Sequence, residues 1–209
     1  MTATRVALTF DTESPDRPAT GGGTERVLEA LDQLVVPATF FVQGRWVEHE
    51  PDTATAIVAA GHLVGNHSHY HVRMPLLTPA GFDEDVREAA RVIEEIVGVD
   101  PRPWFRLPFG AGMDDPAILG RLGALGYRNV DWDVDAMDWE PGATADSVAL
   151  RILTELAAGP DDAIVLLHAW PDPVAGALGS LVPRLREAGA TFVRVDVLAL
   201  ESESVTIPA

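Results

Sequence analysis

The amino-acid sequence predicts an α/β fold with a mostly parallel sheet. Short apolar segments rich in β-branched and aromatic residues recur along the chain, and segments with the 3.6-residue period of an amphipathic helix separate them. Strands and helices that alternate in this way form βα units, whose parallel sheet is buried on both faces. The 209 residues, 47% of them hydrophobic, are enough for one domain with a sizeable core.

Seven segments have the composition of buried strands. Turn-forming residues or helical segments bound each of them. Seven strands can close into a small, irregular barrel or remain an open, doubly wound sheet, and their pattern does not distinguish the two. The expected strands are, in chain order, 5–10, 38–44, 62–67, 103–109, 127–135, 163–169 and 191–195.

Six segments between these strands have helical periodicity. The third has the clearest boundaries, because Thr78 can cap it, Pro79 suits its first position and Gly98 follows its end. We expect a loop at 14–23, a loose end at 201–209 and a single domain over 1–209 whose core runs from about 5 to 195. The expected helices are 24–34, 52–60, 79–97, 115–125, 144–158 and 174–188.

The charge of the chain excludes some classes of partner. It has 32 acidic and 15 basic side chains, all of the latter arginine, and a formal net charge of −17. Such a surface disfavours nucleic acids and anionic membranes. The chain has no cysteine for disulfides or thiolate metal sites, and no apolar run long enough for a signal peptide or a membrane span. We therefore expect a soluble, cytoplasmic protein that binds neither nucleic acid nor membrane.

Three of the six histidines, His67, His69 and His71, lie within five residues. On an extended strand all three side chains would point to one side, whereas in a helical turn only His67 and His71 would share a face. The pair is therefore compatible with both geometries, and His69 with only one. Two imidazoles this close can bind zinc or a similar divalent ion. The alternative is a polar loop.

Ionisable side chains follow five of the seven expected strands. The carboxyl ends of parallel strands meet at one edge of a sheet, where function collects. Each residue alone has a structural explanation, such as a cap or a buried ion pair, but together they predict a site. Besides the histidine cluster, the residues concerned are Asp11, Glu13, Arg106, Asp133, Asp135, Asp138, Trp139 and His168.

These residues support metal-assisted hydrolysis of an amide or ester. The histidine pair can hold a divalent ion that polarises a carbonyl and its attacking water. Asp11 can act as the general base, and His168, from across the barrel, can protonate the leaving nitrogen. Arg106 can orient Asp11 and keep it ionised, while Asp138 can stabilise the imidazolium of His168. The sequence has no nucleophile elbow, cysteine nucleophile or phosphate-binding loop that would indicate another chemistry.

Five short motifs resemble, in order, those of the polysaccharide deacetylase family, which is carbohydrate esterase family 4 or the NodB-homology domain. They are TFDT, HSHYH, RLPFG, DAMDW and IVLLH, and the resemblance covers about residues 5 to 195. It implies a distorted (β/α)7 barrel and a divalent-metal N-deacetylase that acts on acetamido sugars.

The resemblance also implies a role for each matched residue. Asp11 would be the general base, and Arg106 would orient it. His168 would be the general acid, with Asp138 as its partner. The metal ligands would be His67 and His71. The backbone near Phe109 would stabilise the oxyanion, and Trp139 would form the wall of the groove that holds the acetyl methyl group.

One position departs from the family's pattern. The first motif ordinarily ends in a second Asp that completes the metal site, and this chain has Thr12 there. A neutral hydroxyl is a much poorer ligand than a carboxylate. Three outcomes are open. Water could complete the coordination with Thr12 behind it, or the metal could bind weakly or not at all. Alternatively, Glu13 could turn toward the metal, although strand alternation puts its side chain on the same side as that of Asp11. We expect a two-histidine site of weakened affinity that binds zinc, with cobalt or another divalent ion as alternatives.

Three hypotheses of function follow. The first is a hydrolase that removes N-acetyl, or alternatively N-formyl, groups from an amino sugar, a chitooligosaccharide or a related soluble glycan. The second keeps the fold but acts on a non-sugar amide, with or without a metal, and Thr12 is its main support. The third is a catalytically silent carbohydrate-binding protein, which would have no need of a base, an acid and their partners together.

Overall fold

The sheet contains eight strands in the part of the chain that the structure describes. The fold is taken from a computed structural model, which describes residues 5–13 and 21–198, so that most of the predicted loop at 14–23 and all of the predicted loose end at 201–209 lie outside the described residues. The strands are β1 (Arg5–Thr12), β2 (Thr39–Val42), β3 (Leu63–Asn66), β4 (Trp104–Phe105), β5 (Arg128–Asn129), β6 (Val134–Asp135), β7 (Asp162–His168) and β8 (Thr191–Phe192).

The six predicted helices are present within a residue or two of their expected ends, and α2 was not predicted. No helix among the described residues is long and apolar enough to cross a lipid bilayer. The helices are α1 (Gly23–Leu34), α2 (Gly44–His49), α3 (Pro51–Ala59), α4 (Pro79–Ile96), α5 (Pro116–Ala124), α6 (Ala145–Ala158) and α7 (Pro173–Glu187), with single 3₁₀ turns η1 (Met74–Leu76) and η2 (Pro108–Gly110).

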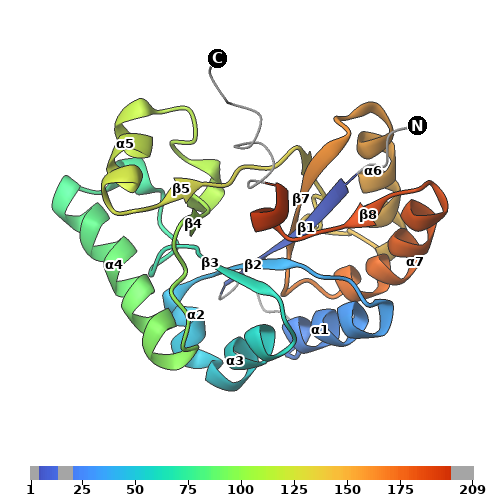
Figure 1. Ribbon diagram of the computed structural model, residues 1–209, viewed down its shortest axis with the longest axis horizontal. Coiled ribbons are helices and arrows are strands. Elements are labelled where there is room, and N and C mark those ends of the chain that lie inside the picture. The colour runs from blue at the N-terminus through green and yellow to red at the C-terminus, as the bar shows by residue number, and fades with distance from the viewer. Residues whose placement is uncertain (1–4, 14–20, 199–209) are drawn as a thin grey trace, which may run out of the picture.

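All strand pairs of the described sheet are parallel, in the order β5-β4-β3-β2-β1-β7-β6. β8 pairs with the first residues of β1, on the edge that β2 occupies further along. In Figure 1 the sheet curls, and the helices surround it on the left, below and on the right. This is the two-layered βα arrangement that the alternating pattern predicts.

The predicted strand 127–135 is in fact two strands, which pair with opposite ends of the sheet. β5 pairs with β4, and β6 pairs with β7. Between them, the Val130 N–H donates to the Phe105 carbonyl at 2.7 Å and the Asp133 N–H donates to the Ile164 carbonyl at 2.9 Å. One short segment therefore crosses from one end of the curled sheet to the other (Figure 1). The fold is a distorted (β/α)7 barrel, which confirms the predicted architecture and excludes the open sheet.

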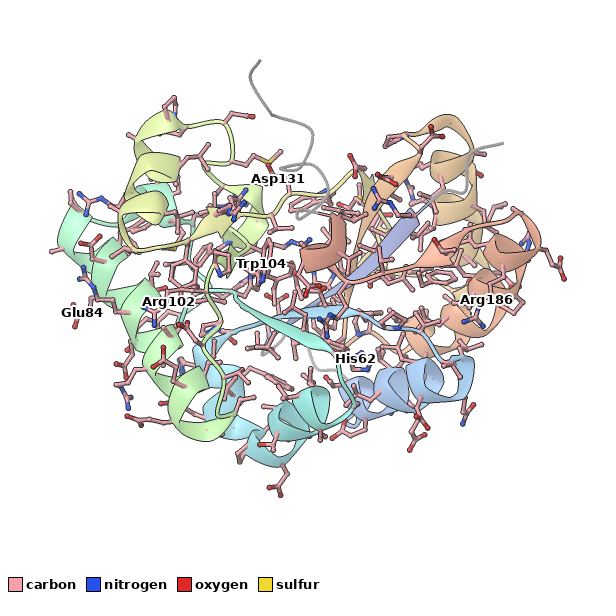
Figure 2. The ribbon with its side chains drawn as sticks, viewed as in Figure 1. His62, Glu84, Arg102, Trp104, Asp131 and Arg186 are labelled. Carbon is pink, nitrogen blue, oxygen red and sulfur yellow. The ribbon has the colours of Figure 1, made fainter. Side chains whose placement is uncertain are left out.

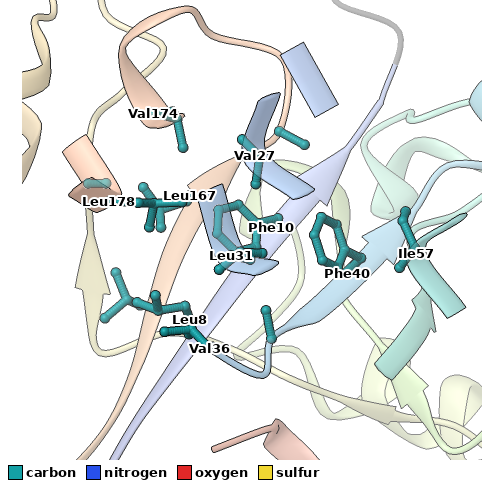
Figure 3. Packing of buried hydrophobic residues seen from close by; sticks show 14 of the residues in the cluster. Leu8, Phe10, Val27, Leu31, Val36, Phe40, Ile57, Leu167, Val174 and Leu178 are labelled. Atoms are coloured by element: carbon teal, nitrogen blue, oxygen red, sulfur yellow. The ribbon is translucent and has the colours of Figure 1, made fainter. Parts of the chain in front are cut away.

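The outer face of the sheet carries the main core. Val6, Leu8 and Phe10 of β1 are completely buried and pack against the surrounding helices. Figure 3 shows Leu8 and Phe10 beside Leu31 of α1, with Phe40 of β2 next to them. The rings of Phe10 and Phe40 stack at a centroid distance of 5.0 Å. Alternate positions of β1 therefore face the helices, and the positions between them face the inside of the barrel.

The inside of the barrel is divided into an apolar and a polar part. Ala7, Phe41 and Val195 form a small apolar cluster, against which Trp104 packs. Trp104 lies within the curl in Figure 2. The next inward position of β1 beyond Ala7 is Thr9, and the one after that is Asp11. Because apolar side chains fill one end, the ionisable groups gather at the carboxyl ends of the strands.

We predict that the stacked ring of Phe10 is essential to the outer core. Phe10→Ala is expected to lower the free energy of unfolding by about 3–5 kcal/mol, because the side chain is completely buried and its loss leaves a cavity. Urea denaturation followed by circular dichroism measures this. Leu150→Ala is the control, since that side chain is 59% exposed, and should change the value by no more than about 0.5 kcal/mol. A Phe10→Ala effect below about 1 kcal/mol would contradict the core assignment.

Candidate active site

A cavity of about 490 Å³ opens at the carboxyl ends of the strands. It has the size of an ordinary small-molecule site, and it combines aromatic walls with a few ionisable groups. Seven of its lining residues were singled out in the sequence, namely Asp11, Glu13, His71, Phe109, Asp135, Trp139 and His168. Its full lining is Asp11, Glu13, His71, Arg73, Phe109, Trp132, Asp135, Trp139, Leu166, His168 and Trp170.

Asp11 is held by a buried arginine. The Arg106 Nη1 donates to Asp11 Oδ1 at 2.8 Å and to Thr9 Oγ1 at 2.8 Å, and its Nε donates to the Val130 carbonyl at 3.1 Å. The guanidinium is completely buried and lies 4.2 Å from the centre of the Phe41 ring. One oxygen of Asp11 is therefore fixed by a charge-assisted hydrogen bond. The other, Oδ2, lies 3.4 Å from His67 Nε2.

His67 presents a ring nitrogen whose lone pair could bind a metal ion. Its Nδ1 lies 2.8 Å from the Arg106 carbonyl oxygen, which can only accept, so Nδ1 carries the proton and Nε2 has the lone pair. Burial lowers the pKa of His67, while neighbouring Asp11 and Glu13 oppose the shift, and the resulting pKa is about 4. The imidazole is therefore neutral at pH 7. Protein metal sites commonly fix the ligand tautomer through such a hydrogen bond.

The histidine cluster lies in a tight loop that is neither strand nor helix. β3 ends at Asn66, and Ser68 and His71 then adopt left-handed backbone conformations with φ of 63° and 54°. Asn66 Oδ1 accepts from the Ser68 N–H at 2.8 Å, and Ser68 Oγ accepts from the His71 N–H at 2.9 Å. These bonds hold a conformation that is unfavourable for non-glycine residues. The rings of His67 and His71 come together with centroids 4.8 Å apart.

His69 points away from this pair. Its Nε2 lies 4.0 Å from Glu48 Oε2, and its Nδ1 faces Gly44, where a Cβ would come within 2.4 Å of it. Its backbone N–H donates to Asp85 Oδ1 at 2.9 Å. His69 therefore packs against α2, and Gly44 leaves the space for it.

Glu13 joins the histidine pair, whereas the Thr12 hydroxyl has no hydrogen-bond partner among the described residues. One ligand atom each of Glu13, His67 and His71 lie within 4.8 Å of one another. Glu13 Oε2 contacts His71 Nε2 and, although buried, has no partner with hydrogen-bond geometry. Burial raises the pKa of Glu13, but the close contact with the His71 imidazole outweighs it and lowers the pKa to about 2. A carboxylate and two imidazole nitrogens form a donor set that fits a divalent ion.

His168 is paired with Asp138. Asp138 Oδ1 lies 2.8 Å from His168 Nδ1, and Asp138 Oδ2 accepts from the His168 backbone N–H at 2.7 Å. Burial lowers the pKa of His168, but the charge and hydrogen bond of Asp138 outweigh it and raise the pKa to about 9. β7 pairs directly with β1, and Asp11 and His168 are partners in register. His168 therefore lies beside Asp11, and the prediction that it comes from across the barrel is wrong.

Aromatic residues form the mouth of the cavity. Phe109 and Trp139 are 51% and 40% exposed, and Phe109 has a left-handed backbone with φ of 59°. The centres of the Phe109 and His71 rings lie 4.5 Å apart, and the guanidinium carbon of Arg73 lies 4.6 Å from the centre of the Phe109 ring. The rings thus continue outward from the histidine pair, as flat surfaces on which a sugar ring can pack.

Some predicted site residues have other surroundings, and some lining residues were not predicted. Asp133 is exposed and accepts from the Ile164 N–H at 2.8 Å, which secures the end of the split strand. Asp135 lines the cavity but accepts from the Met137 N–H at 2.9 Å. Sequence reasoning missed Trp170, two residues after His168, whose indole N–H donates to Glu13 Oε1 at 3.2 Å. An aromatic residue just beyond a strand end was the available signal.

Comparison with known proteins identifies the family. Residues 1–130 match the sequence model of the polysaccharide deacetylases, and the chain belongs to this family, as its motifs predicted. It is 33% identical over 199 residues to the chitooligosaccharide deacetylase of Bradyrhizobium sp. (strain ANU 289), which covers 88% of this chain and 85% of that protein.

Two further similar proteins differ from this deacetylase in length or in activity. The uncharacterized protein YlxY of Bacillus subtilis (strain 168) is 33% identical over 178 residues, or 85% of this chain, and this chain spans only 53% of YlxY. Among solved structures, a mutant of a Bacillus anthracis CE4 family pseudoenzyme with restored enzymatic activity superposes with a TM-score of 0.82 at 30% identity, covering 94% of this chain and 68% of that one. The same fold therefore occurs with and without activity.

We predict that His168 titrates with a pKa of about 9 in the metal-free protein, since Asp138 stabilises its imidazolium. The side chain is then protonated at pH 7 and loses its proton only as the pH rises through 9. Asp138→Asn is expected to lower the pKa clearly, because burial lowers it and the largest opposing influence, the Asp138 carboxylate, is then gone. NMR titration of the histidine ring protons measures both values.

His62 is the internal control for this titration. Burial lowers its pKa and it does not contact Asp138, so its titration should be unchanged by Asp138→Asn. A wild-type His168 that titrates near 6.5, or one that Asp138→Asn leaves at 9, would show that the carboxylate does not control it.

Proposed function

We propose that this protein is a metal-dependent hydrolase that removes N-acetyl groups from an amino sugar, such as that of a chitooligosaccharide or a related soluble glycan. The observation that carries the proposal is the convergence of three groups on one cavity: the Asp11–Arg106 ion pair, the histidine pair at 67 and 71, and the His168–Asp138 pair. Membership of the polysaccharide deacetylase family supports the same reaction.

The metal would be held by His67 and His71. Two imidazole ligands favour zinc over harder ions, and we propose zinc as the native ion, with cobalt as a working substitute. When bound, the ion supplies a Lewis acid for the amide carbonyl and for the attacking water. The Arg106 carbonyl orients His67 toward it. Thr12, with its neutral hydroxyl, would stay behind the coordination sphere.

Asp11 would be the general base. Arg106 occupies Oδ1, so Oδ2, which faces His67, is free to take the proton of the attacking water. The guanidinium pairs with the carboxylate and fixes its orientation. Because the ion pair is buried, this orientation is set before substrate arrives.

His168 would be the general acid. Its Nδ1–H donates to Asp138, so the proton on Nε2 is the one available to the leaving nitrogen. The pKa of about 9 keeps this proton in place at neutral pH. Transfer to the leaving amine completes hydrolysis, since the amine is a poor leaving group until it is protonated.

Phe109 and Trp139 would position the substrate. Both line the cavity and are partly exposed, and Trp139 would form the wall of the groove that holds the acetyl methyl group. We assign the backbone near Phe109 to stabilisation of the tetrahedral oxyanion. A neutral acetamido sugar suits a protein with a net charge of −17 better than nucleic acid or an anionic membrane does.

A second candidate function is carbohydrate binding without catalysis. Thr12 stands where the family's motif has a carboxylate, and one similar structure is that of a reactivated pseudoenzyme. A binding protein would not need a buried arginine on Asp11 or a buried aspartate on His168. Those pairs favour the hydrolase, and an amidase that acts on a non-sugar amide remains an outcome of the tests below.

We predict that the purified protein binds zinc or cobalt and releases acetate from chitooligosaccharides. His71→Ala is expected to lose the metal and the activity together, because it removes one of two imidazole ligands. Metal analysis by mass spectrometry and an enzymatic acetate assay measure the two. Activity that persists after chelation would contradict metal dependence. Metal binding without acetate release from any sugar would favour the silent binding protein or an amidase that acts on a non-sugar amide.

We predict that Asp11→Asn lowers kcat by about 10²–10⁴-fold while the protein still binds metal, since the amide cannot accept the proton of water. Asp133→Asn is the matched control, because Asp133 is an exposed aspartate at the edge of the sheet and does not line the cavity. It should keep nearly full activity. Equal losses of kcat in both variants would indicate that Asp11 stabilises the fold and does not take part in the reaction.

A further inference from the structure

The family's second carboxylate is missing at position 12, and its replacement leaves an unsatisfied group. Thr12 is 1% exposed, and its Oγ1 has no hydrogen-bond partner among the described residues. A hydroxyl is neutral at pH 7 and coordinates a divalent ion much more weakly than a carboxylate does. With Thr12 alone, the two histidines would be the only strong protein ligands.

Glu13 supplies a carboxylate from the next position. β1 ends at Thr12, so the alternation of strand residues no longer dictates where residue 13 points. A glutamate is also one methylene longer than an aspartate and reaches further from its Cα. Its buried Oε2 lies against His71 Nε2 without hydrogen-bond geometry, and both belong to the group that lies within 4.8 Å together with His67.

Trp170 fixes the orientation of this carboxylate. The indole N–H can only donate, and it donates to Glu13 Oε1 at 3.2 Å. Oε1 is thereby occupied, and Oε2 is turned toward the histidines. Trp170 itself is held in a half-buried position beside the His168 ring, with centroids 5.8 Å apart.

Asp11, the other nearby carboxylate, is already bound to Arg106. Its Oδ1 accepts from the buried Arg106, and Oδ2 faces His67 Nε2 at 3.4 Å as the proposed base. If Asp11 became a ligand, the site would lose the group that activates water. Glu13 can join the histidines without disturbing that ion pair.

We infer that Glu13 has taken over the missing carboxylate's place as the third protein ligand of the metal, and that Trp170 is the positioning residue that presents Glu13 Oε2 to it. The site is then a Glu-His-His site with the carboxylate moved one residue along the chain. This inference rests on the metal site of the proposed function, and its test measures metal affinity instead of acetate release.

The test is a set of variants whose Zn²⁺ and Co²⁺ affinities are measured by chelator competition. Glu13→Gln keeps the size of the side chain and an acceptor for Trp170, and is expected to weaken binding about 100-fold or more. Trp170→Phe keeps the ring and removes the N–H, and is expected to weaken binding about tenfold. Glu29→Gln, an exposed carboxylate on α1, should bind metal as the wild type does.

Two double variants separate a ligand from a merely structural residue. In the wild-type background, Thr12→Asp should change the metal affinity less than about threefold, because Glu13 is already the third ligand. In the Glu13→Gln background, Thr12→Asp should restore the metal affinity to within about tenfold of the wild type. Trp170→Phe should have no further effect in Glu13→Gln, because it acts through Glu13. Thermal unfolding of each metal-free variant shows that the fold is kept.

Specific results would overturn the inference. The first is a Glu13→Gln variant that binds metal as tightly as the wild type, and the second is a gain in metal affinity from Thr12→Asp that is equal in both backgrounds. The others are additive losses of metal affinity from Glu13→Gln and Trp170→Phe, and a wild type that binds neither Zn²⁺ nor Co²⁺. The proposed function fails separately, if the wild type binds metal through Glu13 but releases acetate from no sugar. If acetate is released while Glu13→Gln keeps its metal, only the inference fails.

Discussion

The buried ion pair between Arg106 and Asp11 connects the fold to the site. Arg106 is completely buried, and besides Asp11 it donates to Thr9 of β1 and to the carbonyl of Val130 in the segment that crosses the barrel. A charge this deep is tolerated only because its donors are satisfied, and breaking such a pair typically costs about 3–5 kcal/mol. The same contacts therefore hold the crossing segment in place and fix the carboxylate that faces the histidines.

Local sequence patterns were sufficient for most of the fold. The helix that begins at Pro79 is present as predicted, since the Thr78 side chain accepts from the Gly81 N–H at 3.2 Å and caps it. The division of 127–135 was not predictable in this way. β5 and β6 differ in their partners, which are β4 and β7, and the choice of partner depends on closure of the barrel and not on the composition of the segment.

The candidate site was predictable where chemistry follows a strand end, as for Asp11, Arg106 and His168. It was not predictable where the backbone leaves regular structure. Strand alternation argued against Glu13, but β1 has ended there. The geometry of the histidine loop depends on left-handed conformations at Ser68 and His71, which neither a strand nor a helix template includes. The sequence motifs predicted which residues lie close together, whereas the geometry of their contacts depends on tertiary packing.

The register between β1 and β7 has a consequence for how this protein can diversify. Asp11 and His168 are direct neighbours across two strands, and the Ala169 N–H donates to the Asp11 carbonyl at 3.0 Å. Their spacing is thus inherited from the backbone of the sheet, whose strands lie about 4.8 Å apart in any parallel pair. The aromatic walls, by contrast, stand on the segments around Phe109 and Trp139, outside the strands. Mutation or loop exchange can remodel substrate preference there while the distance between Asp11 and His168, the proposed base and acid, stays constant.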